Sequence, residues 1–271
     1  MIFILGSRGR LGQALAAQYD PSDVVCVERS VYEAWSDSAA SADIKAYFSP
    51  RRTAQSVIYI CSGLLDPRLS AQALLAVNYQ LPRNVIESVA DLGIRVVTFG
   101  TAMEHTLTTN SYVRSKLRLS EYVEHASARG IAATHIRIHT LYGCGEPSPF
   151  MFLGQILNAL RNDIPFAMTL GRQLREYHHV DDDAMAIKVL IDAEVNAVVD
   201  LSHGRPVTLR SLAEAIFSSL DKSHLLQLGA VPEPAEENFD VVFDVPVALT
   251  GMPFRDASSA VVEYIKSRMN A

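Results

Sequence analysis

Short apolar runs alternate with amphipathic segments through the first half of the chain. An apolar run of four to seven residues predicts a buried strand, and apolar positions that recur every three or four residues predict a helix. The predicted strands cover Ile2–Leu5, Val24–Val27, Ser56–Ile60, Ile94–Phe99 and Ala132–Ile138, and the predicted helices cover Leu11–Tyr19, Ala39–Phe48, Ala71–Ala90 and Ser111–Ala128. Because neighbouring parallel strands need a crossover connection, this alternation predicts an α/β fold with a Rossmann-type doubly wound parallel sheet.

The pattern changes after Tyr142, where a loop rich in glycine and proline interrupts the alternation. The later predicted elements are helices over Phe150–Leu160, from Asp182, over Leu209–Leu220 and over Ser258–Arg268, an extended run over Glu176–Val180 and an acidic loop over Ala230–Asn238. These segments are too short for an independent domain. We therefore expect a Rossmann domain over residues 1–140 that takes back about 177–200, and a smaller C-terminal substrate-binding lobe made of 141–176 and 201–271.

Charge and cysteine usage narrow the classes of partner. The formal net charge is −6, whereas general binding to nucleic acid or to an anionic membrane surface needs a basic face, so we expect neither partner. No apolar run reaches the ~20 residues of a membrane helix, and the first residues lack a signal-peptide pattern, which favours a cytoplasmic protein. Cys26, Cys61 and Cys144 are far apart and lack metal-ligand spacing, which predicts reduced thiols and no metal site.

Three glycines lie between the first predicted strand and the first predicted helix, with the spacing GxxGxxG. We expect Gly6 to allow a tight turn, Gly9 to let backbone approach a pyrophosphate, and Gly12 to permit close packing of helix on sheet. The free N–H groups at the helix start would face the phosphates. The alternative is an ordinary strand–helix turn. The predicted dinucleotide-binding residues of this loop are Gly6, Arg8, Gly9, Arg10, Leu11 and Gly12.

Charged residues near the end of the second predicted strand bear on the choice of dinucleotide. Glu28 lies about twenty residues beyond the glycine loop, where a carboxylate can accept the adenosine ribose hydroxyls, and this favours NAD. Arg29 and Arg8 could instead hold a 2′-phosphate, which keeps NADP open. Solvated surface charge is the third interpretation of the two arginines. The expected cofactor is NAD, with NADP as the alternative.

Tyr112 and Lys116 are four residues apart in a predicted helix and therefore share one face. An ammonium group one turn from a phenol favours the phenolate, so we expect Lys116 to lower the pKa of Tyr112 and prepare it for proton exchange. Lys116 could also reach the ribose of a bound nicotinamide. Thr101 follows a predicted strand and could hydrogen-bond the reacting oxygen. The alternatives are an exposed helix for the pair and a helix cap for Thr101.

In this order the glycine loop, Thr101, Tyr112 and Lys116 resemble the extended short-chain dehydrogenase/reductase family. More narrowly, they resemble its branch of nucleotide-sugar epimerases, dehydratases and 4-ketoreductases. The resemblance implies a Rossmann domain, a small sugar-nucleotide lobe, a catalytic set formed by these three residues, and a homodimer. The span from Thr101 to Tyr112 is shorter than the family norm.

The resemblance also implies further binding residues. The segment that ends in Cys61, Ser62 and Gly63 resembles the family's strand over the cofactor, and Asn78 matches the asparagine of its following helix. These four residues are therefore expected to bind the cofactor.

Two later segments extend the resemblance to the substrate. Arg137–Gly143 is similar to the family's R-x-x-N-x-Y-G signature, with Thr140 in the place of the asparagine. Leu174–Asp182 resembles its R-D-Y-x-H-V-D-D segment, whose arginine commonly contacts the nucleotide diphosphate. The resemblance thus implies substrate binding by Arg175 and, less directly, by Thr140 and Thr101.

The implied function is hydride transfer at C4 of a nucleotide-linked sugar, with Tyr112 as acid or base. Ala102 and Met103 stand where the family's dehydratases carry Asp-Glu, so dehydration is not expected. A 4-keto-6-deoxysugar reductase and an epimerase both fit. A non-catalytic dinucleotide-binding regulator is the contrasting hypothesis. The sequence does not indicate the sugar, the nucleotide base or the redox direction.

Overall fold

The chain folds into two units in the computed structural model, which describes residues 1–66, 68–107 and 109–269. Unit 1 comprises Met1–Ile138, Ala184–Leu201 and Pro246–Leu249, and unit 2 comprises His139–Asp183, Ser202–Val245 and Thr250–Ala271.

Two boundaries differ from those expected from the sequence. The chain returns to unit 1 at Ala184 and not near residue 177, because strand β9 (Tyr177–His179) pairs with β6 (Thr140–Tyr142) inside unit 2. The segment Pro246–Leu249, expected in the smaller lobe, belongs to unit 1, and its Leu249 side chain is buried. Helix α8 (Val180–Asp192) therefore begins in unit 2 and ends in unit 1.

Unit 1 is built on six parallel strands in the order β10-β5-β4-β3-β1-β2. The strands are β1 (Ile2–Leu5), β2 (Val24–Val27), β3 (Val57–Ile60), β4 (Arg95–Thr101), β5 (Ala133–Ile138) and β10 (Ala197–Asp200). The chain passes outward from β1 to β2 and then crosses back to β3 on the other side of β1. This confirms the α/β fold and the doubly wound sheet. Edge strand β10 is missed by the sequence pattern because all of its residues are half-buried.

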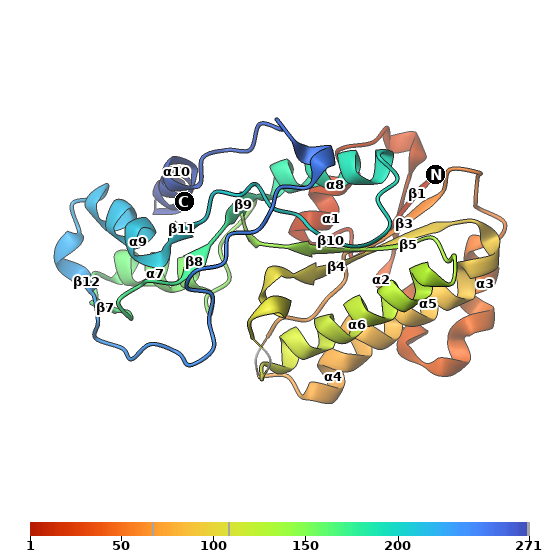
Figure 1. Ribbon diagram of the computed structural model, residues 1–271, viewed down its shortest axis with the longest axis horizontal. Helices are drawn as coiled ribbons and strands as arrows, with labels where there is room; N and C mark the ends of the chain where they lie inside the picture. Colours follow the sequence, from red (N-terminus) through yellow and green to blue (C-terminus); the bar gives the residue numbers. More distant parts are fainter. Residues whose placement is uncertain (67, 108, 270–271) are drawn as a thin grey trace. The chain divides into compact units, whose positions relative to one another are not determined.

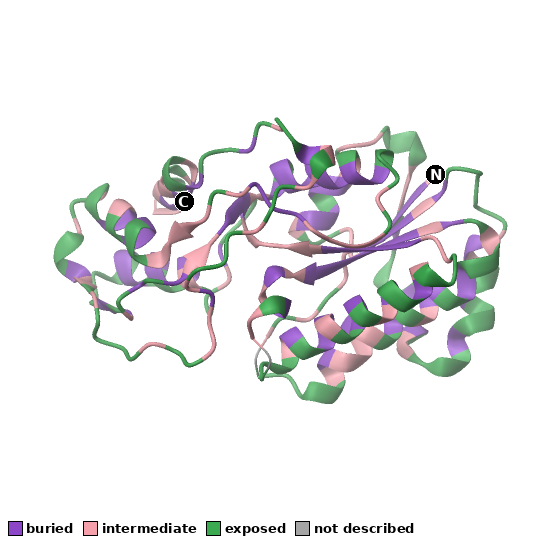
Figure 2. Ribbon diagram, in the orientation of Figure 1, coloured by how far each residue is buried: buried purple, intermediate pink, exposed green. Residues whose placement is uncertain are grey.

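Helices cover both faces of this sheet. They are α1 (Arg10–Ala16), α2 (Arg29–Tyr32), α3 (Ser41–Phe48), α4 (Ala71–Leu75), α5 (Leu81–Val89) and α6 (Ser111–Ala128), together with α8. Figure 1 shows α1 and α8 on one face, with α3, α5 and α6 on the other. On the second face, Phe48, Val85 and Val123 pack with the strand residues Phe3 and Ile58. Buried residues accordingly fill most of the central strands β1, β3, β4 and β5 in Figure 2, while the outer sides of the helices are exposed.

The single helix predicted over Ala71–Ala90 is interrupted by a π-helical turn, η4 (Ala76–Gln80), between α4 and α5. Pro82 follows this turn and has no N–H to donate to the carbonyl four residues earlier. A wider turn absorbs the missing hydrogen bond. The turn also carries Asn78, one of the predicted site residues.

Unit 2 has three helices and short strand pairs. The helices are α7 (Phe152–Asn162), α9 (Leu209–Ser218) and α10 (Ala257–Met269), and the strands are β6, β7 (Phe166–Ala167), β8 (Leu174–Arg175), β9, β11 (Val207–Thr208) and β12 (Leu226–Gln227). Strand β11 pairs with β8, and β12 with β7. Its core brings together Ile156, Phe217 and Ile265, one from each helix. The two-residue strands escape sequence analysis because they are too short to alternate.

Within the described part of the chain, none of the helices combines the length and apolar character that crossing a membrane requires. In the described part of the chain, Cys26, Cys61 and Cys144 form no disulfide bond.

Candidate active site

The glycine loop lies where the strand order reverses, between the carboxyl ends of β1 and β3. Gly6 has φ +81°, and a Cβ there would lie 2.5 Å from the backbone nitrogen of Ser62. A Cβ on Gly12 would lie 2.4 Å from the carbonyl oxygen of Gly6. Both positions therefore require glycine, and Gly12 packs α1 against the loop rather than against the sheet. Gly9 donates its N–H to Gly6 O at 3.0 Å and immediately precedes α1.

The charged residues predicted to select the dinucleotide meet beside this loop. Arg8 donates to the Glu28 carboxylate at 2.8 Å, and their side chains are 86% and 62% exposed. An ion pair this exposed contributes little to stability, so either group is available to a ligand. Arg29 is exposed and begins α2, Arg10 is half-buried at the start of α1, and Leu11 is buried.

The segment after β3 forms the other wall of the loop. Cys61 continues the β1 pairing by donating its N–H to Leu5 O at 2.8 Å. The Ser62 hydroxyl is buried and has no hydrogen-bond partner among the described residues. A Cβ on Gly63 would lie 3.5 Å from the Lys116 Nζ and 3.4 Å from the Asn78 Oδ1. The predicted cofactor segment and the predicted catalytic lysine are thus neighbours within unit 1.

Asn78 makes three hydrogen bonds to protein atoms in the free chain. Its Oδ1 accepts from Leu64 N at 2.9 Å, and its Nδ2 donates to Leu64 O at 2.9 Å and to Ser115 Oγ at 3.1 Å. Both N–H groups of the buried amide are therefore donated to protein atoms. The structure makes Asn78 a positioning residue that ties the segment after Gly63 to helix α6.

Thr101 ends β4 and caps the short helix η6 (Ala102–His105). Its Oγ1 accepts from Met103 N at 3.3 Å, while the Glu104 carboxylate accepts from Thr101 N at 2.8 Å. This reciprocal arrangement is a capping box. Both interpretations of the sequence remain compatible with it, because the cap uses an acceptor site of the hydroxyl and leaves its proton for a ligand.

Tyr112 and Lys116 lie one turn apart at the start of α6. The helix begins after Asn110, whose side chain accepts the N–H groups of Tyr112 and Val113 at 2.9 and 3.1 Å. The Lys116 ammonium is buried and donates to Phe99 O at 2.8 Å, near the end of β4. The helix start and the strand end therefore hold the predicted catalytic pair at the carboxyl edge of the sheet.

Electrostatics in the free chain oppose the expected activation of the phenol. Burial, followed by the charge of Glu104, raises the pKa of Tyr112 above its ordinary value. Burial lowers the pKa of Lys116 to about 8, although Glu104 acts in the opposite direction. In the free chain the pKa of Tyr112 is thus raised and not lowered, first by burial and then by a carboxylate that sequence analysis did not consider.

Glu104 is the polar residue that sequence analysis missed. Its side chain is fully buried and accepts from Arg137 Nε at 2.8 Å, with His135 Nε2 at 3.4 Å. Burial would raise the pKa of Glu104, but His135 and Arg137 lower it to about 2. The carboxylate is therefore ionised at neutral pH. The pattern Thr101-x-x-Glu104 is a recognisable capping-box signal, whereas its burial and its partners depend on the sheet.

The predicted substrate residues lie in unit 2. Thr140 is half-buried at the start of β6 and donates its N–H to Glu176 O at 3.2 Å. Arg175 ends β8, donates through NH1 to Leu174 O at 2.7 Å, and forms an ion pair with Glu237. The guanidinium is thus bound to a carboxylate in the free chain.

A buried polar cluster follows Arg175 in the chain. His178 lies between Asp183 Oδ1 at 2.6 Å and Glu176 Oε2 at 3.0 Å, and Glu176 is 3.3 Å from His203 Nδ1. Burial would lower the pKa of His178, but the two carboxylates raise it to about 9. The possible ligand atoms of Glu176, His178 and His203 lie close enough together to hold a metal ion. However, the His178 and His203 rings are stacked, with centroids 4.5 Å apart and planes 21° from parallel. Lone pairs in stacked ring planes cannot converge on one ion, so this is a hydrogen-bonded cluster.

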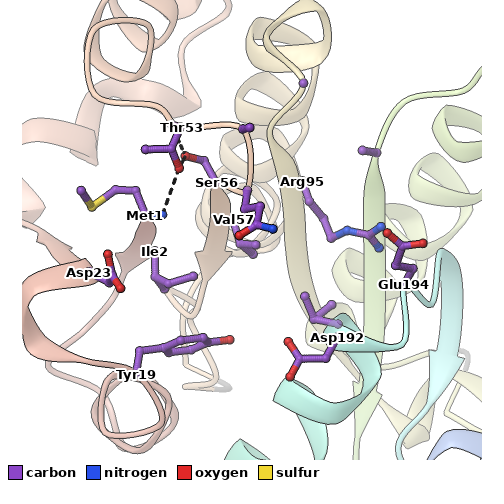
Figure 3. A pocket seen from close by; sticks show the side chains of 15 residues that line it. Met1, Ile2, Tyr19, Asp23, Thr53, Ser56, Val57, Arg95, Asp192 and Glu194 are labelled. Carbon is purple, nitrogen blue, oxygen red and sulfur yellow. Dashed lines mark hydrogen bonds between the residues drawn. The ribbon is translucent and has the colours of Figure 1, made fainter.

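Unit 1 also has a cavity of about 720 Å³ at the amino ends of its strands. Figure 3 shows its wall formed by the starts of β1, β3 and β4, with Arg95 and Asp192 among the charged residues. None of the predicted site residues lines it. Open α/β sheets bind ligands at the opposite, carboxyl edge, where the glycine loop and Tyr112 lie.

A comparison with known protein families identifies the family of the chain. Residues 2–200 match the family described as NAD dependent epimerase/dehydratase. The chain belongs to this family. Its enzymes are NAD-dependent, and the match covers the glycine loop, Thr101, Tyr112, Lys116 and Arg175. No curated protein sequence matches the chain.

Solved structures of low sequence identity share the fold. A UDP-N-acetylglucosamine 4-epimerase from Methanobrevibacter ruminantium M1, in complex with UDP-N-acetylmuramic acid, has a TM-score of 0.76 at 14% identity, over 99% of this chain and 96% of that one. The dTDP-glucose 4,6-dehydratase DesIV of Streptomyces venezuelae, as a double mutant with NAD bound, has a TM-score of 0.77 at 14% identity, over 98% of this chain and 96% of that one. A dTDP-4-dehydrorhamnose reductase from Clostridium acetobutylicum has a TM-score of 0.75 at 15% identity, over 98% of this chain and 99% of that one.

Proposed function

We propose that the chain is an NAD(P)-dependent enzyme that transfers hydride at C4 of a nucleotide-linked sugar, with Tyr112 as acid or base. The observation that carries this proposal is the position of Lys116. Its ammonium lies beside Gly63, in the segment after β3 that is predicted to bind the cofactor, and Lys116 lies one helical turn from Tyr112. A dinucleotide held by the glycine loop would therefore meet the tyrosine–lysine pair inside a single unit.

The residues present fit a dinucleotide. Gly6 lets the loop lie close to the segment after β3, Gly12 lets α1 lie close to the loop, and Gly9 adds no side chain at the start of α1. The buried Ser62 hydroxyl has no partner among the described residues, and a hydroxyl of this kind costs ~1–3 kcal/mol unless something bonds to it. The glycine loop, Glu28 and Ser62 would hold the cofactor, which supplies the hydride chemistry when bound.

Tyr112 performs the proton transfer in this proposal. Its raised pKa keeps the phenol protonated at neutral pH, so it can donate a proton to a C4 carbonyl oxygen during reduction. The Lys116 ammonium, with a pKa of about 8, is mostly charged at pH 7 and stabilises the phenolate that remains. Thr101 orients the same oxygen with its hydroxyl proton. In the oxidative direction the proton moves the opposite way.

Similar structures suggest the substrate class. The archaeal epimerase is described with a UDP-sugar ligand, and the other two enzymes are named for dTDP-linked or dehydro sugars. We propose that Arg175 binds the substrate diphosphate, since a planar guanidinium suits phosphate oxygens. Ala102 and Met103 offer no acid or base for water elimination. Reduction of a 4-keto-6-deoxysugar and epimerisation are therefore favoured over dehydration.

The decisive test is Tyr112→Phe, compared with Tyr122→Phe on the same helix. Loss of an acid–base group removes roughly 10²–10⁴-fold in rate, so Tyr112→Phe should lose turnover of UDP- and dTDP-sugars while binding NAD normally. Tyr122→Phe should retain both. Stoichiometric NAD(P)H consumption would identify a reductase, and product without net consumption an epimerase.

Two results would contradict the proposal. Full turnover by Tyr112→Phe would remove the tyrosine from the chemistry. Tight NAD binding without turnover of any nucleotide sugar by the unmodified chain would favour the regulator hypothesis.

A further inference from the structure

Arg175 forms an ion pair with Glu237 in unit 2, and both charged side chains are largely shielded from water. The Arg175 and Glu237 side chains are only 11% and 12% exposed. Arg175 lies on the two-residue strand β8, and Glu237 lies on the acidic loop. An ion pair shielded from water is held more strongly than a surface pair, and separating it requires a new partner for each charge. An incoming anion would therefore compete with Glu237 for the guanidinium.

The segment that carries Glu237 runs along β8. Leu174 donates its N–H to Asn238 O at 2.8 Å. Earlier in both segments, Arg172 donates through Nε to the Glu233 carboxylate at 3.0 Å. Figure 1 shows this segment, beyond β12, returning beside β8. Two arginines of one strand region thus face two glutamates of one loop. Only the Arg175–Glu237 pair is enclosed, because the Arg172 side chain is 68% exposed.

Unit 2 carries the whole net charge of the protein. It contains nine Lys and Arg against fifteen Asp and Glu, whereas unit 1 contains fifteen of each. Seven of its nine cations form ion pairs with carboxylates: Arg161, Arg172, Arg175, Arg210, Lys222, Arg255 and Lys266. An anionic ligand that binds any of these seven cations, Arg175 included, would therefore have to displace a carboxylate.

We propose that Glu237 is a specificity-determining residue that occupies the phosphate-binding side of Arg175 until a diphosphate displaces it. This inference rests on the proposed function, because it assigns Arg175 to the substrate diphosphate. A diphosphate carries more charge than a carboxylate and offers several oxygens to the guanidinium fork. A neutral sugar cannot exchange for Glu237 in this way. Glu237 thus selects a nucleotide-linked sugar over the free sugar and limits its affinity.

The test uses the full chain loaded with NAD and measures the binding of UDP, dTDP, GDP and ADP by titration calorimetry. In Glu237→Gln, Arg175 loses its competitor, so the Kd of the preferred nucleotide should fall about tenfold, equivalent to ~1.4 kcal/mol. Glu233→Gln is the matched control, since it removes the same charge from the same loop but frees Arg172. Its Kd should stay within about twofold of the unmodified chain. Arg175→Gln should weaken binding, and adding Glu237→Gln to it should restore nothing.

The outcomes separate this inference from the function beneath it. If a nucleotide binds the unmodified chain and Glu237→Gln is no better than Glu233→Gln, the role of Glu237 is refuted while the proposed function stands. A gain that persists in the Arg175→Gln background refutes it as well. If no nucleotide binds any folded variant, the substrate assignment itself is wrong, and the inference goes with it.

Discussion

At the residue scale, the charge next to a side chain decides its chemistry more than its position in a motif does. The YxxxK spacing places Lys116 one turn from Tyr112, but in the free chain the Lys116 ammonium donates a hydrogen bond to Phe99 O. Glu104, which belongs to no catalytic motif, raises the pKa of Tyr112 together with burial. A carboxylate near a phenol disfavours the phenolate because both are negative. Burial first, and Glu104 second, therefore oppose ionisation of the tyrosine in the free chain.

Replacing Glu104 by Gln should move the pH–rate profile to lower pH. The substitution removes the negative charge that, after burial, raises the pKa of Tyr112, and this change favours ionisation of the phenol. In the reductive direction the variant should lose activity at a lower pH than the unmodified chain. In the oxidative direction its activity should rise at a lower pH.

Glu121→Gln is the control, because Glu121 is exposed on α6 and changes the formal charge equally. An unchanged profile for Glu104→Gln, in a variant whose circular dichroism is native, would show that Glu104 has no influence on the proton transfer.

At the element scale, the start of α6 sets the position of the tyrosine. The Asn110 side chain accepts two backbone N–H groups that have no helical partner, including that of Tyr112 itself. The first turn of the helix is thus held by a residue two positions before Tyr112. Loosening this cap would free the turn that carries Tyr112 while leaving the rest of the helix packed.

Asn110→Ala should destabilise the protein by about 1 kcal/mol, the usual cost of losing such a cap. It should also lower turnover more than it lowers NAD affinity, because the glycine loop is not attached to Asn110. Denaturant unfolding and steady-state kinetics measure the two effects. Asn110→Ser, which retains a capping oxygen, should recover most of both. Equal loss in the Ser and Ala variants would mean that the amide has another role.

At the scale of the whole molecule, ligand binding to the folded chain should be visible as stability. A ligand at a hundred times its Kd adds about 2.7 kcal/mol to the free energy of unfolding. Glu28 lies beside the glycine loop, where it would accept ribose hydroxyls but repel a 2′-phosphate. Arg8 and Glu28 form an exposed ion pair beside the loop, so a 2′-phosphate at Arg8 would also lie near the Glu28 carboxylate.

NAD should therefore stabilise the chain against thermal unfolding more than NADP at equal concentration. Glu28→Ala should reverse or abolish this preference, since it removes the repulsion and frees Arg8. Differential scanning fluorimetry with both cofactors provides the measurement. Greater stabilisation of the unmodified chain by NADP would overturn the assignment of NAD.

Features that depend on neighbours in the chain could be predicted from the sequence. The alternation of strands and helices, the glycine loop and the bounds of α6 all follow from patterns a few residues long, because backbone hydrogen bonding and side-chain periodicity act locally. Gly6 is an example, since its left-handed φ suits the sharp turn after a strand.

Only the tertiary structure decided which distant groups meet. Glu104 meets His135 and Arg137 across adjacent strands, and Glu237 meets Arg175 from 62 positions further along the chain. Asn78 has its amide taken by Leu64 and Ser115 for the same reason. Burial and charge pairing are properties of the folded surroundings, and they set pKa values and the access of ligands to a side chain. Local patterns therefore predicted the residue types of the candidate site, while packing determined the burial and the charge partners of each residue.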